Sequence, residues 1–248
     1  QRQMCIRDRT NTEFVYLLHE AEELGHTIGG NTNYGSNSKN EQESGVRYDS
    51  AGRTLTGCDP LTWSHDGTAD GVFGLCGNFW EWVTGLRLHK GVVEYTPNND
   101  AAVEGYTEKP DWTVAEVKRR PLKLYGNSAG DVVMSVAKEI EENWEGCHMA
   151  DLQLEELDEV PEIAYKLGIV PHDWKHETAG LWADSELEES VPRRGSSFIN
   201  ASSGGAGALY LDGARSYVRD NVSLRSALFL EDWELVTELL KAGATAHA

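Results

Sequence analysis

The sequence predicts a single domain of the α+β class, and three observations support this prediction. Helical patterns and short strand patterns are segregated along the chain rather than alternating. Residues 26–70 are rich in Asn, Gly and Ser, which indicates a long loop. Residues 71–96 form the most apolar stretch, which is typical of core strands. With 248 residues the chain can bury a sizeable core, and we expect long loops on that core rather than a doubly wound sheet.

The first predicted element is a helix that begins after Thr10 and ends at Gly25. Thr10 and Glu13 have the spacing of a capping box. The apolar residues that follow fall on one helical face: Phe14, Leu17, Leu18, Ala21 and Leu24. The long loop over residues 26–70 needs side chains that hold it in place. We expect aromatic residues to do so: Tyr34, Tyr48 and Trp63.

Strands and further helices are predicted from the remaining patterns. Alternation over residues 86–88 and the run 92–95 indicate core strands beside a glycine turn. A second helix is predicted over residues 131–143. A short helix is predicted from Pro161, with Pro at its first position and Gly168 just after its end.

The acidic runs and the C-terminal tail complete the chain. Residues 155–162 and 186–189 are rich in Glu and Asp, and we interpret both runs as solvated faces. Residues 231–248 form a helical tail on this interpretation, with an amphipathic helix over 231–242. Its apolar side carries Leu235, Leu239 and Leu240.

The net charge excludes several classes of partner. The chain has 41 acidic and 22 basic residues, a formal charge of −19. Such a chain has no sequence-independent attraction for nucleic-acid phosphates or for anionic lipid surfaces. No apolar run approaches the roughly 20 residues that a membrane-spanning helix needs. We therefore expect no nucleic-acid partner and no membrane insertion, which leaves an enzyme acting on small substrates or a binding module.

Residues 1–9 share no pattern with the rest of the chain. Residues 4–9 match the translation of the transposon adapter used in sequencing-library preparation, so we interpret residues 1–9 as an artefact outside the fold. Without them the chain has 19 basic and 40 acidic residues, a charge of −21. Cys58, Cys76 and Cys147 remain, and this odd number predicts neither a disulfide framework nor a zinc site. The natural N-terminus would then be missing, with any signal peptide or upstream domain.

Residues that suggest nucleophilic chemistry have simpler structural interpretations. Ser64, His65 and Asp66 are adjacent, whereas a catalytic triad converges from distant segments, so we interpret them as a structural turn. Cys76 lies in an apolar stretch and is typical of a small core residue, and Cys58 lies in a turn. Neither cysteine has a neighbouring base in the sequence, so we predict no catalytic residues.

Metal and phosphate sites are also not predicted. His172 and His176 have helical i,i+4 spacing, but the residues between them offer no general base of the His-Glu-x-x-His kind. Residues 204–207 are rich in glycine and lack the Lys and Ser/Thr of a phosphate-binding loop. We therefore expect no metal site and no cofactor. A calcium site stays an open alternative, because side chains with oxygen ligands are numerous. The spacing of an EF-hand is not present.

Residues 71–83 read Gly-Val-Phe-Gly-Leu-Cys-Gly-Asn-Phe-Trp-Glu-Trp-Val. This run resembles the G-N-V-W-E-W signature of the formylglycine-generating (sulfatase-modifying factor) family, whose fold is a variant of the C-type lectin fold. Residues 30–35, 55–68 and 97–102 resemble loops of the same family. The resemblance implies a C-type-lectin-like fold with long loops. The family's first strand and first helix would lie largely upstream of residue 10, which implies an N-terminally truncated chain.

The C-terminal part of this domain resembles one particular group of proteins. Residues 194–198 (Arg-Gly-Ser-Ser-Phe), 214–216 (Ala-Arg-Ser) and 222–228 resemble the R-G-G-S-W, A-R-S and I-G-F-R-S-A pattern. That pattern closes the variable proteins of diversity-generating retroelements. The departures are Ser196 for the second Gly, Phe198 for Trp, and Ser-Leu for Gly-Phe at 223–224. The matches imply a domain over residues 10–230 with a variable segment at 195–228.

The enzymatic branch of the family uses a late pair of cysteines to hold copper and oxidise a substrate thiol. No residue after Cys147 is a cysteine. Without a thiolate pair a copper site of that kind is absent, so we expect a protein that is not an enzyme of this type. The resemblance then implies that the fold has been retained without its chemistry.

The variable-protein interpretation can be tested on the composition of residues 195–228. In these systems a reverse transcriptase randomises adenines of Asn codons, and the resulting codons cannot encode Lys, Glu, Gln, Met or Trp. These five types make up about one residue in five of the whole chain, so about seven are expected in this segment. The segment contains none. A Gly/Ser-rich linker is the alternative, but linkers usually tolerate Lys, Glu and Gln, and residues 209–211 alternate as a strand does.

Residue-by-residue matching to the family pattern assigns a ligand-binding surface over residues 199–221. The positions that match the diversified codons are Ile199, Asn200, Ser202, Ser203, Ala208, Tyr210, Asp212, Gly213, Tyr217, Arg219, Asp220 and Asn221. The positions that match the invariant scaffold are Leu209, Leu211, Ala214, Arg215 and Arg225. Tyr with Ser, Gly and Asn is also the composition of antibody binding loops.

The resemblance implies a ligand-binding variable protein from a phage or bacterium. Its ligand would be an exposed protein or glycan, and its location extracellular, on a cell surface or on a virion. Two alternatives stay open. One is an enzyme of the sulfatase-modifying family with unrecognised chemistry, and the other is a catalytically inactive scaffold domain whose C-terminal segment is not diversified.

Overall fold

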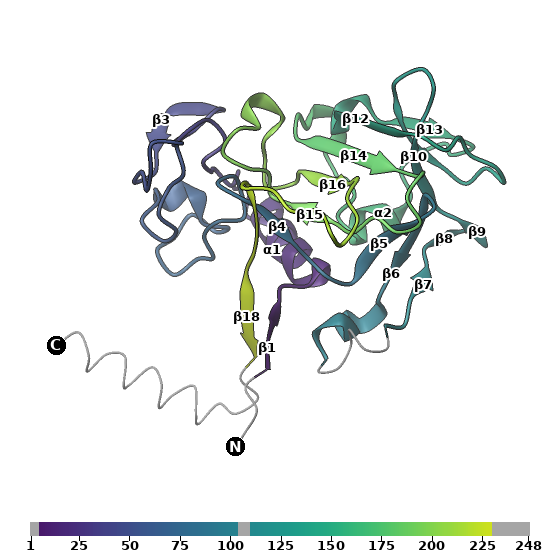
Figure 1. The fold of residues 1–248 in the computed structure, drawn as a ribbon, viewed down its shortest axis with the longest axis horizontal. Helices are drawn as coiled ribbons and strands as arrows, with labels where there is room; N and C mark the ends of the chain where they lie inside the picture. The colour runs from purple at the N-terminus through teal and green to yellow at the C-terminus, as the bar shows by residue number, and fades with distance from the viewer. Residues whose placement is uncertain (1–4, 104–109, 230–248) are drawn as a thin grey trace.

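The computed structural model describes residues 5–103 and 110–229 and has mixed α+β architecture (Figure 1). Within these residues most regular structure lies in β-sheets, and helices are few and short. The α+β class predicted from the sequence is therefore confirmed. The helical tail predicted over residues 231–242 lies outside the described residues.

Helix α1 (Asn11–Glu23) forms as its capping sequence predicts. The Thr10 hydroxyl accepts a hydrogen bond from the Glu13 amide at 3.1 Å, and the Glu13 carboxylate accepts one from the Thr10 amide at 3.0 Å. Phe14 and Ala21 on the apolar face pack into a cluster with Leu75. The helix is thereby attached along one side to the loop that precedes strand β4.

The first large sheet has the strand order β13-β11-β10-β6-β5, and β7 also pairs with β6. Its strands are β5 (Leu86–His89), β6 (Val92–Tyr95), β7 (Thr113–Val114), β10 (Lys123–Gly126), β11 (Val132–Ser135) and β13 (Gln153–Glu155). The strands expected over residues 86–88 and 92–95 are confirmed. The helix predicted over residues 131–143 is wrong, because β-branched Val132 and Val133 pair with β10 and bury both faces of β11.

The second large sheet has the strand order β12-β14-β16-β15-β4-β17. Its strands are β4 (Trp80–Trp82), β12 (Trp144–His148), β14 (Gly180–Asp184), β15 (Arg193–Arg194), β16 (Leu209–Leu211) and β17 (Val222–Leu224). The sheet brings together four chain regions that are far apart in the sequence. Strands β16 and β17 come from the segment 195–228, as the alternation over residues 209–211 predicts.

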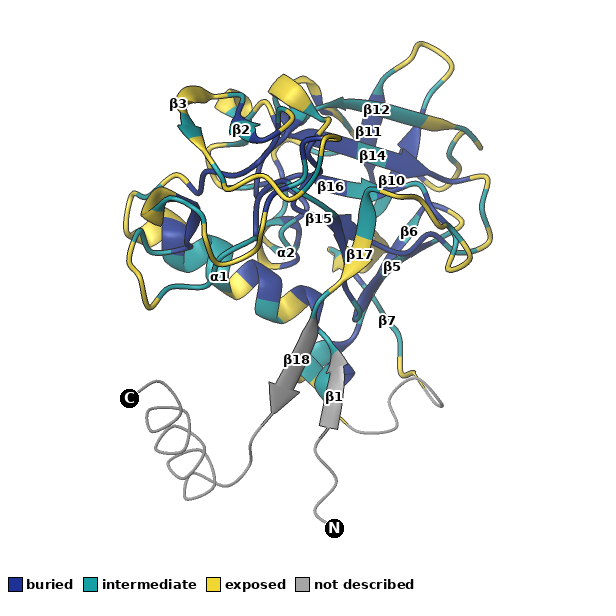
Figure 2. Cartoon of the chain, turned by 60° about the vertical axis from the view of Figure 1, so that its left-hand side comes forward, coloured by how far each residue is buried: buried dark blue, intermediate teal, exposed yellow. Residues whose placement is uncertain are grey.

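The main core lies on the inner side of this second sheet. Leu181, Leu209 and Leu211 belong to the largest buried cluster, together with Leu124 and Met134 of the first sheet. Because side chains alternate along a strand, the residues between them point to the opposite face. Figure 2 shows buried residues concentrated in strands such as β11 and β14, with exposed residues mainly in the loops.

Short elements connect these sheets. Strand β2 (Ser36–Asn37) pairs with β3 (Asn40–Ser44), and β8 (Glu116–Val117) pairs with β9 (Arg120–Pro121). Helix α2 (Glu162–Lys166) follows Pro161, and Gly168 adopts a φ of 63° just after its end, so the predicted short helix is confirmed. Short 3-10 turns span Leu61–Trp63, Pro97–Ala102, Met149–Asp151, Trp174–His176 and Ala201–Ser203.

The loop-rich segment 26–70 lies to the left of the two large sheets in Figure 1. Trp63 is buried, and its indole N–H donates to the Glu43 carboxylate at 3.1 Å, so it anchors this segment as expected. Tyr34 is exposed although it packs edge-on against Phe198. Tyr48 is 70% exposed, so the expectation that it holds the loop is wrong.

Residues 5–9 are part of the folded structure, whereas we expected residues 1–9 to lie outside it. Strand β1 (Cys5–Asp8) pairs antiparallel with β18 (Ser226–Phe229), and the two strands lie together below the main body in Figure 1. Main-chain pairing of this kind tolerates most sequences. Arg9 is buried, and its Nε lies 3.4 Å from the Glu81 carboxylate. Strand β1 and helix α1 are the first two elements of the described chain.

The acidic runs are only in part solvated faces. Most of their carboxylates are exposed, but Glu189 is half-buried between Arg87 and Arg215. Glu155 accepts hydrogen bonds from Tyr125 and Ser135. No helix among residues 5–103 and 110–229 is long and apolar enough to cross a membrane.

Candidate functional site

One row of residues crosses the outer face of the second sheet. The strand register places Gly146, Trp182, Tyr210, Arg193, Trp82 and Leu224 opposite one another in that order. Trp80 and Trp144 lie two residues along their strands from this row and so share its face. We call Trp80, Trp82, Trp144, Trp182, Tyr210 and Tyr217 the aromatic face.

Ring contacts join most of the aromatic face. The Trp80 and Tyr210 ring centroids are 3.9 Å apart, and those of Trp182 and Tyr210 are 5.2 Å apart. Trp144 and Trp182 are stacked, with centroids 5.6 Å apart and planes 14° from parallel. Such pairs stabilise beyond their buried area by about 0.5–1.5 kcal/mol each. These ring contacts therefore stabilise the aromatic face.

Arg193 lies at the centre of the aromatic face and is almost completely buried. Its Cζ is 4.1 Å from the Tyr217 ring centroid and 5.6 Å from that of Trp82, which are cation–π distances. Its guanidinium forms an ion pair with Asp212. Burial raises the pKa of Asp212, although the Arg193 charge opposes this increase. Arg193 therefore fills the centre of the face and is itself a structural cation rather than a free binding group.

A hydrogen-bond network holds the loop after Phe198 against this face. The side-chain oxygen Oδ1 of Asn200 accepts from the Ser197 backbone N–H at 2.8 Å and from the Ser197 hydroxyl at 2.7 Å. The Asn200 amide donates to the Tyr210 hydroxyl at 3.3 Å, and Asn221 donates to the Ser197 hydroxyl at 3.1 Å. Burial raises the pKa of Tyr210 to about 12, so its hydroxyl is neutral at physiological pH. The loop is thus positioned by its own polar side chains.

The twelve residues that the sequence assigns to a ligand surface occupy three environments. Four are exposed: Ile199, Ser202, Arg219 and Asp220. Six are half-buried: Asn200, Ser203, Tyr210, Asp212, Tyr217 and Asn221. Two are buried: Ala208 and Gly213.

The two buried positions do not fit the assignment. Ala208 is fully buried in a cluster with Trp80 and Ala179, so its side chain does not reach a ligand. A Cβ at Gly213 would lie 3.3 Å from the Arg193 guanidinium, which leaves this residue beneath the surface. Both positions lie next to the ends of β16, where Trp80 and Ala179 cover Ala208 and the Arg193 guanidinium lies over Gly213.

Sequence reasoning missed the residues that extend this face beyond residues 195–228. Trp144 and Trp182 lie on β12 and β14. The available signal was the alternation Leu181-Trp182-Ala183. It places Trp182 on one face of the strand and the two core residues Leu181 and Ala183 on the other.

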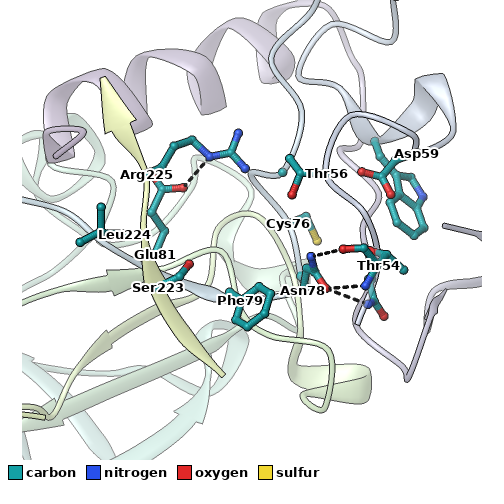
Figure 3. Close-up of a pocket in the computed structure, with 14 residues that line it drawn as sticks. Thr54, Thr56, Asp59, Cys76, Asn78, Phe79, Glu81, Ser223, Leu224 and Arg225 are labelled. Carbon is teal, nitrogen blue, oxygen red and sulfur yellow. Dashed lines mark hydrogen bonds and ion pairs between the residues drawn. The ribbon is translucent and has the colours of Figure 1, made fainter. Parts of the chain in front are cut away.

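A cavity of about 370 Å³ lies beneath β17 and the loop before β4 (Figure 3). Glu81 and Arg225 point toward one another in it, with Oε2 and Nε 3.7 Å apart, and Arg225 also donates to the Phe73 carbonyl at 2.5 Å. Burial raises the pKa of Glu81, while Arg9 and Arg225 oppose that increase. On the other side Asn78 exchanges two hydrogen bonds of 2.9 Å with the Thr54 backbone. These contacts hold the loop before β4 between the residue that follows β17 and the loop-rich segment 26–70.

The thiol in this cavity is not reactive. Cys76 is buried, and desolvation raises the pKa of its thiol to about 12, so it is protonated at physiological pH. The interpretation of Cys76 as a small core residue is confirmed. Cys58 is exposed, and burial raises the pKa of the Cys147 thiol to about 12.

The structural interpretation of Ser64, His65 and Asp66 is also confirmed. The Ser64 hydroxyl donates to the Leu61 carbonyl at 2.9 Å, and His65 Nδ1 accepts from the Val72 amide at 2.8 Å. Asp66 accepts from Thr68 within its own turn. The Ser64 hydroxyl and the His65 Nδ1 atom, which a nucleophile and its base would use, therefore both form hydrogen bonds within the loop.

His172 and His176 each contact a nearby carboxylate rather than one another. His172 contacts Glu22 at 3.1 Å, and His176 contacts Asp173 at 2.6 Å. Within the described part of the chain, no group of three or more His, Cys, Asp or Glu side chains is placed to hold a metal ion.

No protein-family model matches the sequence, and no curated protein matches it. The fold and the site therefore define a mixed α+β domain, mostly β, whose second sheet carries an aromatic outer face with polar loops at its edge.

Proposed function

We propose that this chain is a ligand-binding variable protein of a diversity-generating retroelement, with a C-type-lectin-like fold. One observation carries the proposal. Along β16, Leu209 and Leu211 match the invariant scaffold and are fully buried, whereas Tyr210 between them matches a diversified codon and faces outward. The division inferred from the family pattern thus coincides with the two faces of β16 at these three positions.

The absence of five residue types over residues 195–228 supports the same proposal. Lys, Glu and Gln are common on protein surfaces, yet this segment lacks them while exposing Ser202, Arg219 and Asp220. A segment that was merely solvent-exposed would retain these types. Randomised Asn codons exclude them for a genetic reason that is independent of burial.

The physical basis of binding resembles that of an antibody surface. Tyr217 offers a rigid amphipathic ring, and Ile199 and Ser202 lie on the adjoining loop. Contacts at these positions can change without disturbing Leu209 and Leu211 in the core. We propose as ligand an exposed protein or glycan met outside the cell, at a cell surface or from a virion.

The alternatives predict other properties. An enzyme of the sulfatase-modifying family would oxidise a substrate thiol with copper, and the late cysteine pair that this chemistry uses is missing from the sequence. Copper-dependent thiol oxidation by the purified protein would favour that alternative. A scaffold domain without diversification would carry no near-copy of its own C-terminal coding segment.

The flanking DNA provides the decisive test. We expect a near-copy of the segment that encodes residues 195–228, differing mainly at adenines and lying beside a reverse transcriptase gene. A complete locus without such a copy would contradict the proposal.

A binding assay tests the surface itself. Fluorescently labelled protein is applied to a panel of whole bacterial cells, and Tyr217→Ala with Arg219→Ala is expected to abolish labelling of any cell that the wild-type protein labels. Arg219→Ala alone should leave the thermal midpoint nearly unchanged because Arg219 is exposed, whereas Tyr217→Ala should lower it modestly because this ring packs on Arg193 at 4.1 Å. Lys138→Ala, exposed and outside the face, is the matched control. Tyr210→Ala is unsuitable, since this ring packs on Trp80 and its removal would destabilise the fold.

A further inference from the structure

A short hairpin over residues 46–55 carries exposed hydrophobic side chains on one face. The Tyr48 N–H donates to the Arg53 carbonyl at 2.7 Å, and the Leu55 N–H donates to the Val46 carbonyl at 2.8 Å. These four side chains share a face, because residues paired directly and residues two apart along a strand point the same way. On that face Val46, Tyr48 and Leu55 are 50%, 70% and 41% exposed. The hairpin thus presents three large hydrophobic side chains to solvent together.

The opposite face of the hairpin is attached to the rest of the domain. Thr54 is buried, and its backbone exchanges two hydrogen bonds with the Asn78 side chain (Figure 3). Arg47, which pairs with Thr54, packs over Gly35, where an added Cβ would come within 2.7 Å of the Arg47 Nε. The exposed face is therefore held outward by contacts on its other side. An ordered group of exposed hydrophobic side chains is typical of an interaction site.

Arg53 joins this face to the segment 195–228. Its Nη2 donates to the Asp220 carboxylate at 3.1 Å, and its Cζ lies 5.4 Å from the ring centroid of Phe198. Ile199, which follows Phe198, is 46% exposed. Nη1 of Arg53 donates to the Asp49 carboxylate at 2.9 Å, so two carboxylates surround one guanidinium. The hairpin face therefore adjoins the exposed part of the segment, and the junction between them is slightly acidic.

The exposed groups favour a protein ligand over a glycan. Sugar rings stack on open aromatic faces, but the rings of the aromatic face cover one another, with Trp144 stacked on Trp182 and Trp80 on Tyr210. The hairpin instead exposes two branched aliphatic side chains and one tyrosine, which lose most water against apolar side chains of a protein. The net charge of −19 and the surplus carboxylate beside Arg53 favour a partner with basic residues around that contact.

We propose that the exposed face of the hairpin, together with Ile199, binds a cell-surface protein through an apolar contact that basic residues of the partner surround. The proposal rests on the proposed function, because it extends the same ligand surface across Arg53. It deepens that function by assigning the ligand to proteins and by dividing the surface in two. The hairpin lies outside residues 195–228 and supplies a constant apolar contact, and the exposed residues of the segment set the specificity.

The test uses bacterial cells that the fluorescently labelled wild-type protein labels in the panel described above. Treating the cells with proteinase K is expected to abolish labelling, whereas periodate oxidation of their glycans should leave it unchanged. The double variant Val46→Ser with Tyr48→Ser should raise the half-saturating concentration about tenfold or more, because two apolar contacts are lost. Tyr16→Ser, on α1 and 66% exposed, is the matched control and should label cells as the wild-type protein does.

Thermal unfolding should show that these variants keep the wild-type fold, because the replaced side chains are at least half exposed. Labelling that resists proteinase K and is lost after periodate would overturn the proposal in favour of a glycan. Undiminished labelling by the double variant would exclude the hairpin from the ligand surface. In both cases, loss of labelling by Tyr217→Ala with Arg219→Ala would still support the proposed function. If the wild-type protein labels no strain, the hairpin proposal is contradicted, and the flanking DNA still decides the proposed function.

Discussion

The guanidinium Nε of Arg194 donates to the side-chain oxygen of Asn11 at 2.6 Å, and both residues are buried. This bond joins β15 to the first turn of α1. The other two nitrogens of Arg194 donate to the carbonyls of Leu167 and Gly168 at 2.9 and 3.0 Å, at the C-terminal end of α2. These carbonyls have no partner within the helix and favour a cation. One side chain thus connects a sheet and two helices.

Removing this guanidinium should strongly destabilise the protein. Arg194→Met is expected to lower the free energy of unfolding by about 3 kcal/mol or more, because the Asn11 side-chain oxygen and the Gly168 carbonyl lose the Arg194 donor and the Leu167 carbonyl loses one of its two donors. Burial lowers the pKa of Arg194 to about 9, so the group is still charged at neutral pH. Urea denaturation measures the loss. Arg219→Met, at an exposed site, is the control and should change stability by less than about 0.5 kcal/mol. Equal effects of the two changes would show that Arg194 is not a structural centre.

Glu189 should make stability depend on acidic pH. Its carboxylate accepts from Arg215 at 2.6 Å and from Arg87 at 2.9 Å, and these contacts lower its pKa from 4.5 to about 2. A carboxylate with a depressed folded-state pKa stabilises above its unfolded pKa, and that stabilisation is lost as pH falls from about 4.5 to about 2.

We therefore expect Glu189→Gln to be less stable than the wild-type protein at pH 6 by an amount on the order of 1–2 kcal/mol, after allowance for solvent screening. Unfolding curves of the two proteins should converge toward pH 2. Glu139→Gln, at an exposed position, serves as control. A difference that persists unchanged at low pH would contradict the assignment.

Arg9 should matter to stability although it belongs to the segment that we interpreted as an artefact. It lies 3.4 Å from Glu81, whose side chain is 5% exposed. Arg9→Met would leave this carboxylate paired with Arg225, 3.7 Å away, and should cost about 3 kcal/mol. Combining it with Glu81→Gln should recover part of the loss, because the uncompensated charge is removed. Additive losses in thermal and urea unfolding would refute the coupling.

The thiols should differ sharply in reactivity. In a Cys5→Ser background, Ellman's reagent is expected to modify the exposed Cys58 in the native state and to leave the buried Cys76 untouched until the protein unfolds. Burial also raises the pKa values of Cys76 and Cys147 to about 12, which suppresses their thiolates at neutral pH. Adding Cys58→Ser should abolish the native-state signal. Rapid labelling of Cys76 at neutral pH would show that its cavity opens readily.

Several elements were predictable because their signals are local. The capping box of Thr10 and Glu13 defines the start of α1 through contacts within one turn, and Pro161 with Gly168 brackets α2 in the same way. Residues 131–143 show the limit of such signals. Their pattern fits a helix as well as a strand, and pairing of Val132 and Val133 with β10 decided the outcome.

The candidate surface was likewise predictable only where its signals are local. Chain composition alone indicated that residues 195–228 are unusual, and the alternation over residues 209–211 indicated which side chains face out. The burial of Ala208 and the position of Trp182 over Gly146 depend on strands that pair across long stretches of sequence. Burial of this kind is a property of the assembled sheet and has no local signature.

The sequence by itself determined the α+β class, the acidic character, the first helix and the compositional gap in the C-terminal segment. The tertiary structure decided which aromatic rings meet, that Arg193 and Arg194 are buried, and that residues 5–9 join the fold. The physical reason is that periodicity and capping act over a few residues, whereas burial and ion pairing depend on neighbours brought together by sheet register.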